Sequence, residues 1–217
     1  MTKKETAKRY FLFIIGLMIS GIGVGFTKYA ELGVSPISSV PNIMSIRFPV
    51  LTIGNYLIIW NCILILGQVI ILKKDFKPIQ LLQVPLSFVF GYFTDFGVRL
   101  AAFIPKEIYI VRLLLAVAGV ITLGLGISLA VIANVIMNSG EAFVKAVSDK
   151  ANKEFGNVKI AFDISNVVLA LVLSLIFFEG KILGMREGTV IAAVFTGITV
   201  KLFTKLLNEK LTSVLKR

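Results

Sequence analysis

Three ionisable side chains fall inside long apolar stretches of the sequence: Asp95, Asp163 and Lys201. A charge in such surroundings is costly, so it marks the path of an ion or solute or pairs with another charge. Asp163 lies a turn or more into its stretch, with Asn166 one turn further along, and is the leading candidate. Lys201 could pair with Asp163, whereas Asp95 has Arg99 four residues on, the spacing of a local helical ion pair.

Two short segments open with signals for the start of a helix. Ser35 is a favourable N-cap, and Pro36 then occupies the first helical position. Asn138 and Ser139 offer a second cap, with Glu141 in the first turn, where the helix dipole favours an acid. Free N–H groups at helix starts bind polar or anionic groups. Two interpretations stay open: both helices lie on the membrane surface, or their starts dip into it and line a solute path.

Enzyme chemistry finds little support in the composition. The chain of 217 residues has no histidine and one cysteine, which excludes histidine-based zinc sites and Ser–His or Cys–His nucleophile pairs. No phosphate-binding loop of the Walker type occurs. We therefore expect no enzyme activity, no catalytic residue, no metal site and no cofactor.

The stretches that hold these residues are long enough to cross a membrane. The chain is 57% hydrophobic and 16% charged, whereas soluble domains are about a quarter charged. Apolar runs lie at about 10–30, 52–72, 79–97, 110–133, 158–178 and 188–204, and each approaches the roughly 20 residues that a helical span needs. The sequence predicts an all-α membrane protein, a single domain over 1–217 with six transmembrane helices and short helices within 31–51 and 134–157.

The positive charges are distributed unevenly among the loops. Sixteen of the 23 lysines and arginines lie in the N-terminus, the loops near 73–77 and 134–159, and the C-terminus with its basic amphipathic tail, 206–217. The positive-inside rule then places both termini in the cytoplasm. This asymmetry accounts for the net charge of +11, so we expect the lipid bilayer as a partner and no nucleic acid.

The two halves of the sequence carry similar features in the same order. The aligned pairs are Arg9–Arg112, Gly16–Gly119, Gly21–Gly124 and Gly23–Gly126 at an offset of 103, Gly54–Gly156, Asn55–Asn157 and Asn61–Asp163 at 102, and Gly91–Gly197 at 106. With three spans each, halves of about 9–104 and 105–205 would be inverted copies, as in many transporters. The alternative is chance matching, since glycine is frequent in membrane helices.

Glycine-containing motifs recur along the chain: Gly21-Ile22-Gly23-Val24-Gly25, Leu32-Gly33-Val34-Ser35-Pro36, Thr52-Ile53-Gly54, Gly91 through Asp95, and Gly188-Thr189. Together they resemble the pattern of the YczE/YitT-like bacterial integral membrane proteins. The resemblance implies a multi-pass protein of the bacterial plasma membrane, for which a transport role is presumed. Two positions depart from the pattern: Ile37-Ser38-Ser39 lacks the expected acidic residue, and Leu82-Gln83 replaces an expected Gly-Thr pair.

These features favour a small transporter or permease-like protein for an unknown small-molecule or ionic substrate. The candidate residues along its path are Ser35, Pro36, Asn61, Asn138, Ser139, Asp163 and Asn166. One alternative is a substrate-binding subunit of an ATP-driven uptake complex, since such subunits are also six-span, basic and about this long. Another is a non-transporting accessory or regulatory protein that acts through residues 139–155 and the basic tail. A homo-oligomer or a membrane partner is compatible with each.

Overall fold

The computed structural model describes residues 2–216, and within them the regular structure is entirely helical. The helices are α1 (Lys3–Ala30), α2 (Pro36–Arg47), α3 (Ile53–Leu72), η1 (Lys73–Asp75), η2 (Pro78–Leu82), α4 (Gln83–Ala101), α5 (Tyr109–Ala133), α6 (Ser139–Ala151), α7 (Phe155–Phe177) and α8 (Glu187–Lys216). Six helices (α1, α3, α4, α5, α7 and α8) are long and apolar enough to cross a membrane. The expected all-α architecture of six spans and two short helices is confirmed, and the chain is an integral membrane protein.

Local capping explains where several helices begin and end. The Thr2 side chain accepts a hydrogen bond from the Glu5 N–H (3.2 Å), so α1 begins at Lys3. Glu31 and Asn152 end α1 and α6 in the left-handed conformation, with φ of 57° and 52°. The predicted amphipathic tail is no separate element, because α8 continues through it without a break.

The first and fifth helices, α1 and α5, form the central pair of the bundle and are its most buried spans. Glycines let their backbones touch. A Cβ added at Gly16 would lie 2.7 Å from the Gly126 carbonyl oxygen, and one at Gly23 would lie 2.7 Å from that of Gly119. Helix association in membranes depends on such close packing, since lipid offers no hydrophobic gain. These four positions leave no room for a larger side chain.

Two arginines join the ends of this central pair. Arg9 donates from Nη1 to the carbonyl of Ala133 (3.1 Å), at the end of α5. Arg112 donates from Nε to the carbonyl of Ala30 (2.8 Å), at the end of α1. Each guanidinium at the start of one helix therefore satisfies a carbonyl that the end of the other helix leaves without an intrahelical partner.

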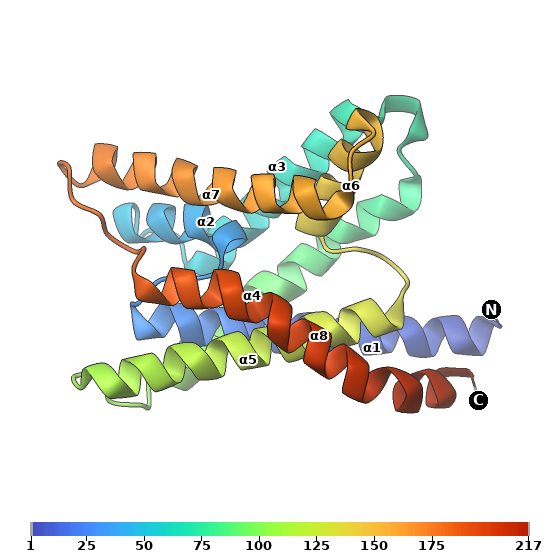
Figure 1. Ribbon diagram of the computed structural model, residues 1–217, viewed down its shortest axis with the longest axis horizontal. Helices are drawn as coiled ribbons and strands as arrows, with labels where there is room; N and C mark the ends of the chain where they lie inside the picture. Colours follow the sequence, from blue (N-terminus) through green and yellow to red (C-terminus); the bar gives the residue numbers. More distant parts are fainter. Residues whose placement is uncertain (1, 217) are drawn as a thin grey trace.

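The remaining helices surround this pair. Helix α4 packs on α1 and α8 packs on α5, while α3 packs on α4 and α6, and α7 packs on α2 and α6. Figure 1 shows that α2 and α6 begin in the interior and run toward opposite ends of the bundle. The edge-to-face contact of Phe48 with Phe177 places the end of α2 beside the end of α7.

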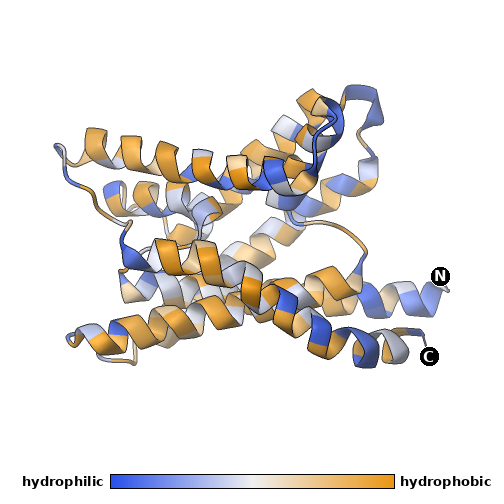
Figure 2. Cartoon of the chain, in the orientation of Figure 1, coloured by the Kyte–Doolittle hydropathy of each residue, from blue (hydrophilic) through white to orange (hydrophobic). Residues whose placement is uncertain are grey.

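Apolar side chains cover the outer faces of the long helices. Leu66, Ile176 and Val190 are each more than half exposed. Figure 2 shows hydrophobic residues along the length of the spans, with hydrophilic residues gathered at the start of α1 and in the second half of α8. Such a surface suits the hydrocarbon interior of a bilayer, which solvates exposed apolar residues without cost.

Candidate functional site

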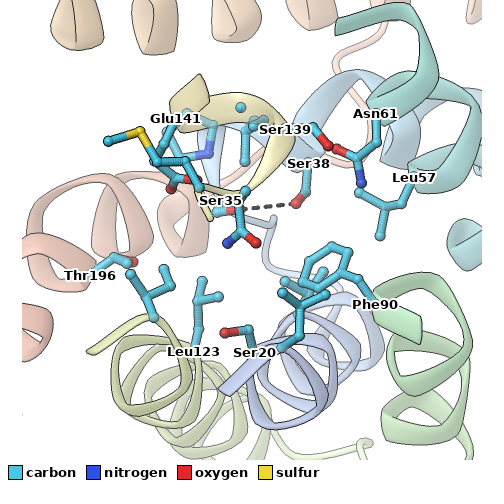
Figure 3. Close-up of a pocket in the computed structure, with 18 of the residues that line it drawn as sticks. Ser20, Ser35, Ser38, Leu57, Asn61, Phe90, Leu123, Ser139, Glu141 and Thr196 are labelled. Carbon is cyan, nitrogen blue, oxygen red and sulfur yellow. Dashed lines mark hydrogen bonds between the residues drawn. The ribbon is translucent and has the colours of Figure 1, made fainter. Parts of the chain in front are cut away.

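A cavity of about 450 Å³ lies at the centre of the helix bundle. One stripe of α1 lines it with Phe13, Leu17, Ser20 and Val24, and parts of α3, α4, α5 and α8 complete its walls together with the starts of α2, α6 and α7. Figure 3 shows Ser20 on one side of this space and Ser35 and Glu141 on the other. The volume falls in the range of small-molecule sites, about 300–1,000 Å³.

The start of α2 forms one part of the wall. Pro36 is its first residue and Ser35 its N-cap, and both are buried. The Ser35 hydroxyl does not cap the helix but donates to the Ser38 hydroxyl (3.0 Å). No acidic residue occupies the first turn, so the positive end of the helix dipole, equivalent to about half a charge, is not compensated locally.

The start of α6 forms the facing part of the wall. Asn138 is the N-cap and makes no side-chain capping bond, Ser139 follows, and Glu141 is the acidic residue of the first turn. Gly140 lies directly against α2, since a Cβ added there would clash with Cδ1 of Ile37. The starts of the two short helices therefore meet at the cavity.

Polar contacts hold both starts in place. Gln68 and Gln83, both buried, exchange amide hydrogen bonds of 3.0 and 3.1 Å, and Gln68 also donates to the Ser139 carbonyl (3.2 Å). On the α2 side, the Gly188 N–H at the start of α8 donates to the Leu32 carbonyl (2.8 Å), just ahead of α2. The start of α6 is thus positioned by Gln68 of α3, and the segment before α2 by the start of α8.

The charged residues of the cavity lie on α6 and α7. Glu141, Lys159 and Asp163 line it, and Lys159 and Asp163 form an ion pair one turn apart on α7. Because Lys159 and Asp163 neutralise each other, the Glu141 carboxyl group is the one ionisable group among these three without an opposite charge. The starts of α2, α6 and α7 each place the positive end of a helix dipole at the cavity, and burial raises the pKa of the Glu141 carboxyl group. The wall is therefore most positive at the start of α2, whose first turn holds no acidic residue.

Three buried polar atoms of the wall have no hydrogen-bond partner: Ser20 Oγ, Trp60 Nε1 and Thr196 Oγ1. Ser20 is 1% exposed. An unpaired buried polar group costs about 1–3 kcal/mol, and such groups in native proteins call for an explanation. The three residues that carry these atoms all line the cavity.

Six of the seven residues predicted along a solute path line the cavity: Ser35, Pro36, Asn61, Asn138, Ser139 and Asp163. Asn166 does not. It is 3% exposed and donates to the Phe162 carbonyl (2.8 Å), while its Oδ1 atom has no partner. The structure therefore brings both helix starts together with Asn61 and Asp163 but leaves Asn166 in the packing behind them.

Asp95 and Lys201 lie outside the cavity. Asp95 accepts hydrogen bonds from Thr52 Oγ1 (2.6 Å) and the Gly54 N–H (3.0 Å), and among the described residues it forms no ion pair with Arg99. The local pair suggested by their spacing gives way because the start of α3 offers the carboxylate free N–H groups.

Lys201 is exposed, and within residues 2–216 it does not pair with Asp163. Lys159, which lies on the same helix as Asp163, takes that place. The pairing considered for Asp163 and Lys201 is therefore replaced by a local one, because i,i+4 neighbours on one helix meet without any help from tertiary packing.

Ser20, Trp60 and Thr196 are not among the residues predicted from the sequence. For Ser20 a signal existed: Phe13, Leu17, Ser20 and Val24 recur at intervals of three or four residues, and Ser20 is the polar member of this stripe. Trp60 and Thr196 carry no comparable signal, because only the fold shows which face of their helices turns inward.

The cavity is open between α7 and α8. Phe155 on α7 and Gly197 on α8 line it and are exposed. The two helices scarcely touch, and Figure 1 shows them apart along their lengths. Phe155 is the first residue of α7, and Figure 1 shows that α7 begins at the end of the bundle where both termini lie. A solute can therefore reach the cavity from this end.

Comparisons with known proteins add one match. A family model described as "Family of unknown function (DUF6198)" matches residues 7–205, which is nearly the whole chain. Neither the comparison with curated proteins nor that with solved structures found a match. Within the described residues, no three Asp, Glu or Cys side chains group closely enough to hold a metal ion. The chemistry of the site is therefore argued from its own residues.

Proposed function

The chain belongs to the family of unknown function DUF6198, and we propose that it is a small transporter that moves a polar solute across the membrane. One observation carries this proposal: the starts of two short helices meet in a central cavity beside the Ser20 hydroxyl, which is buried without a partner. Interrupted helices whose N-termini point into the bundle are how many transporters bind the polar groups of a substrate.

We infer that the two halves, about 9–104 and 105–205, are inverted repeats. Arg9 and Arg112 are 103 residues apart, and so are their carbonyl acceptors, Ala30 and Ala133. A chance match of glycines does not account for this pair of reciprocal contacts. Three spans per half make the second copy inverted relative to the first, the arrangement typical of alternating-access transporters.

The packing of the helices supports the same relationship. The contact of Gly16 with Gly126 becomes that of Gly119 with Gly23 when each residue is replaced by the one 103 positions away, and both contacts are present. Likewise α2 packs on α7, and its counterpart α6 packs on α3. The approximate axis of the repeat then passes between α1 and α5, beside the cavity.

The proposed orientation follows from the loops. The excess of lysine and arginine near the termini and in the segment 134–159 puts these parts in the cytoplasm. The opening between α7 and α8 then faces the cytoplasm. The resemblance to YczE/YitT-like proteins suggests that the membrane is the plasma membrane of a bacterium.

The charge distribution suggests the class of solute. The start of α2 offers a positive helix end with the Ser35 and Ser38 hydroxyls, which suits an anionic group. The neighbouring start of α6 offers the Glu141 carboxyl group, which suits a cationic group. Apolar side chains such as Leu57 and Phe90 line another part of the cavity (Figure 3). We therefore propose a small zwitterion with an apolar body.

Uptake by purified protein in liposomes tests the function. Radiolabelled zwitterions, such as amino acids and betaines, are offered one by one, and each active solute is then tested with Ser35→Ala, Glu141→Gln and Asp163→Ala. We expect flux for at least one class and its loss in all three variants, while insertion and thermal stability are kept. Empty liposomes set the background.

Ser165→Ala is the matched control, because Ser165 is an exposed serine on α7 that does not line the cavity. It should transport at the wild-type rate. Flux of no zwitterion would refute the proposed substrate, and normal flux in the three cavity variants would refute the site. Binding without flux would instead fit a capture subunit of an ATP-driven complex.

A further inference from the structure

The contact between α3 and α4 is closed by two glycines. A Cβ added at Gly54 would clash with the Gly91 carbonyl oxygen, and one at Gly91 would lie 2.6 Å from that of Gly54. The backbones of the two helices therefore touch near the start of α3. This contact holds the start of α3 against the middle of α4.

The corresponding glycines of the second half are apart. Gly156 aligns with Gly54 at an offset of 102, and Gly197 aligns with Gly91 at an offset of 106. A Cβ added at either Gly156 or Gly197 would meet nothing within 4 Å. Both glycines are exposed, and they lie on α7 and α8, the two helices between which the cavity opens.

A polar contact reinforces the closed pair. Thr52 Oγ1 donates to Asp95 (2.6 Å), and so does the Gly54 N–H (3.0 Å), so that a side chain of α4 caps the start of α3. Breaking this contact would leave both the start of α3 and the Asp95 carboxylate without a partner. We call the contact of Thr52 and Gly54 with Asp95 the first latch.

The same offsets identify the residues of the second half that correspond to the first latch, and these two residues carry opposite charges. Thr52 corresponds to Glu154, the N-cap of α7, and Asp95 corresponds to Lys201 on α8. Both side chains are exposed. Within residues 2–216, the Glu154 side chain bonds only to Asn157 on its own helix (3.3 Å), and the Lys201 side chain has no hydrogen-bond or ion-pair partner. An acid and a base therefore stand on the two helices that leave the cavity open.

We propose that α7 and α8 form a second gate, which closes when Gly156 packs against Gly197 and Glu154 pairs with Lys201, while the gate of Gly54, Gly91, Thr52 and Asp95 opens. The inference rests on the proposed inverted halves. The present structure is then the state open to the cytoplasm. Closing one gate as the other opens exposes the cavity to opposite sides in turn, since the two latches occupy equivalent places in inverted copies.

Disulfide trapping tests the gates without any solute. The native cysteine is removed with Cys62→Ala, and cysteine pairs replace the first latch (Thr52→Cys/Asp95→Cys) or the second (Glu154→Cys/Lys201→Cys). The proteins are oxidised in membrane vesicles. We expect the first pair to crosslink rapidly, because its side chains already touch, and the second pair more slowly, through a minor state of the equilibrium.

Glu154→Cys/Lys210→Cys is the matched control, because Lys210 is another exposed lysine of α8, about 14 Å further along the helix. It should not crosslink. In a variant with all four latch cysteines, the first crosslink is formed with a limiting amount of oxidant. The second crosslink should then fall to the level of the control pair, since both gates cannot be closed together.

Two results would overturn the proposal. In the first, the Glu154/Lys201 cysteine pair crosslinks no more than the control pair when the first gate is free. In the second, it crosslinks equally well when the first gate is held closed by its disulfide. Labelling provides an independent measurement if the four-cysteine variant inserts poorly. A Thr196→Cys side chain in the cavity should lose its reaction with a membrane-impermeant maleimide once the second pair is crosslinked. These outcomes do not depend on flux, so they separate a failed gate from a failed transport function.

Discussion

Gln68 on α3 and Gln83 at the start of α4 are fully buried and satisfy each other through two amide hydrogen bonds of 3.0 and 3.1 Å. Gln68 carries a third bond, to the carbonyl of Ser139, the first residue of α6. A buried amide pair inside a membrane bundle is expensive unless every group is bonded. This pair therefore positions the start of α6 at the cavity.

The variant Gln68→Leu should lower stability strongly. It strands the Gln83 amide in the interior, which costs about 1–3 kcal/mol. We expect a clear fall in the thermal unfolding midpoint of the detergent-purified protein. The double variant Gln68→Leu/Gln83→Leu should recover part of that loss, because both partners become apolar. Additive losses in the double variant would contradict the pairing.

The glycines of the central pair and those of the open side should respond in opposite ways to alanine. A Cβ at Gly126 would clash with the Ser20 nitrogen and lie 2.5 Å from the Gly16 carbonyl oxygen, so Gly126→Ala should cost about 1–3 kcal/mol through overpacking. Gly197→Ala meets no atom within 4 Å and should stabilise α8 by up to about 1 kcal/mol. Equal unfolding midpoints for the two variants would contradict the close packing of α1 on α5.

Local patterns were sufficient to predict the elements of this fold. Spans follow from the length of apolar runs, and the starts of α2 and α6 follow from Ser35-Pro36 and Asn138-Ser139. These signals concern near neighbours in the chain. For Asp95 the spacing favoured a near neighbour, Arg99, whereas its partners Thr52 and Gly54 come from another helix.

The cavity itself depends on tertiary packing that no local pattern encodes. Ser35 and Asn138 each qualify as the cap of a short helix, but only the fold brings Ile37 of α2 against Gly140 of α6. The cavity is open on one side because α7 and α8 make almost no contact with each other. In the proposed repeat Gly156 and Gly197 align with Gly54 and Gly91, but only the fold shows that the first two are free of contacts and the other two touch.

The Ser20 hydroxyl should contribute to solute binding and not to stability. Because Ser20 Oγ is buried without a partner, Ser20→Ala removes an unsatisfied group and should leave the unfolding midpoint unchanged or raised. A lost hydrogen bond to the solute would weaken binding by about 0.5–1.5 kcal/mol, or roughly 2- to 13-fold. Calorimetric titration of wild type, Ser20→Ala and the control Ser165→Ala measures this. A marked loss of stability in Ser20→Ala would show a structural role instead.

Lys159 and Asp163 set the charge of the cavity together, and their variants should reveal that balance. The pair is about 30% exposed, so neutralising it should change stability by less than about 1 kcal/mol. Asp163→Asn leaves the Lys159 ammonium unpaired, which cancels the excess of the Glu141 carboxyl group and should abolish flux of a zwitterion. Lys159→Gln/Asp163→Asn restores that excess, and we expect flux to return in part. Proteoliposome uptake measures both, and a double variant as inactive as Asp163→Asn would mean that the solute contacts Asp163 directly.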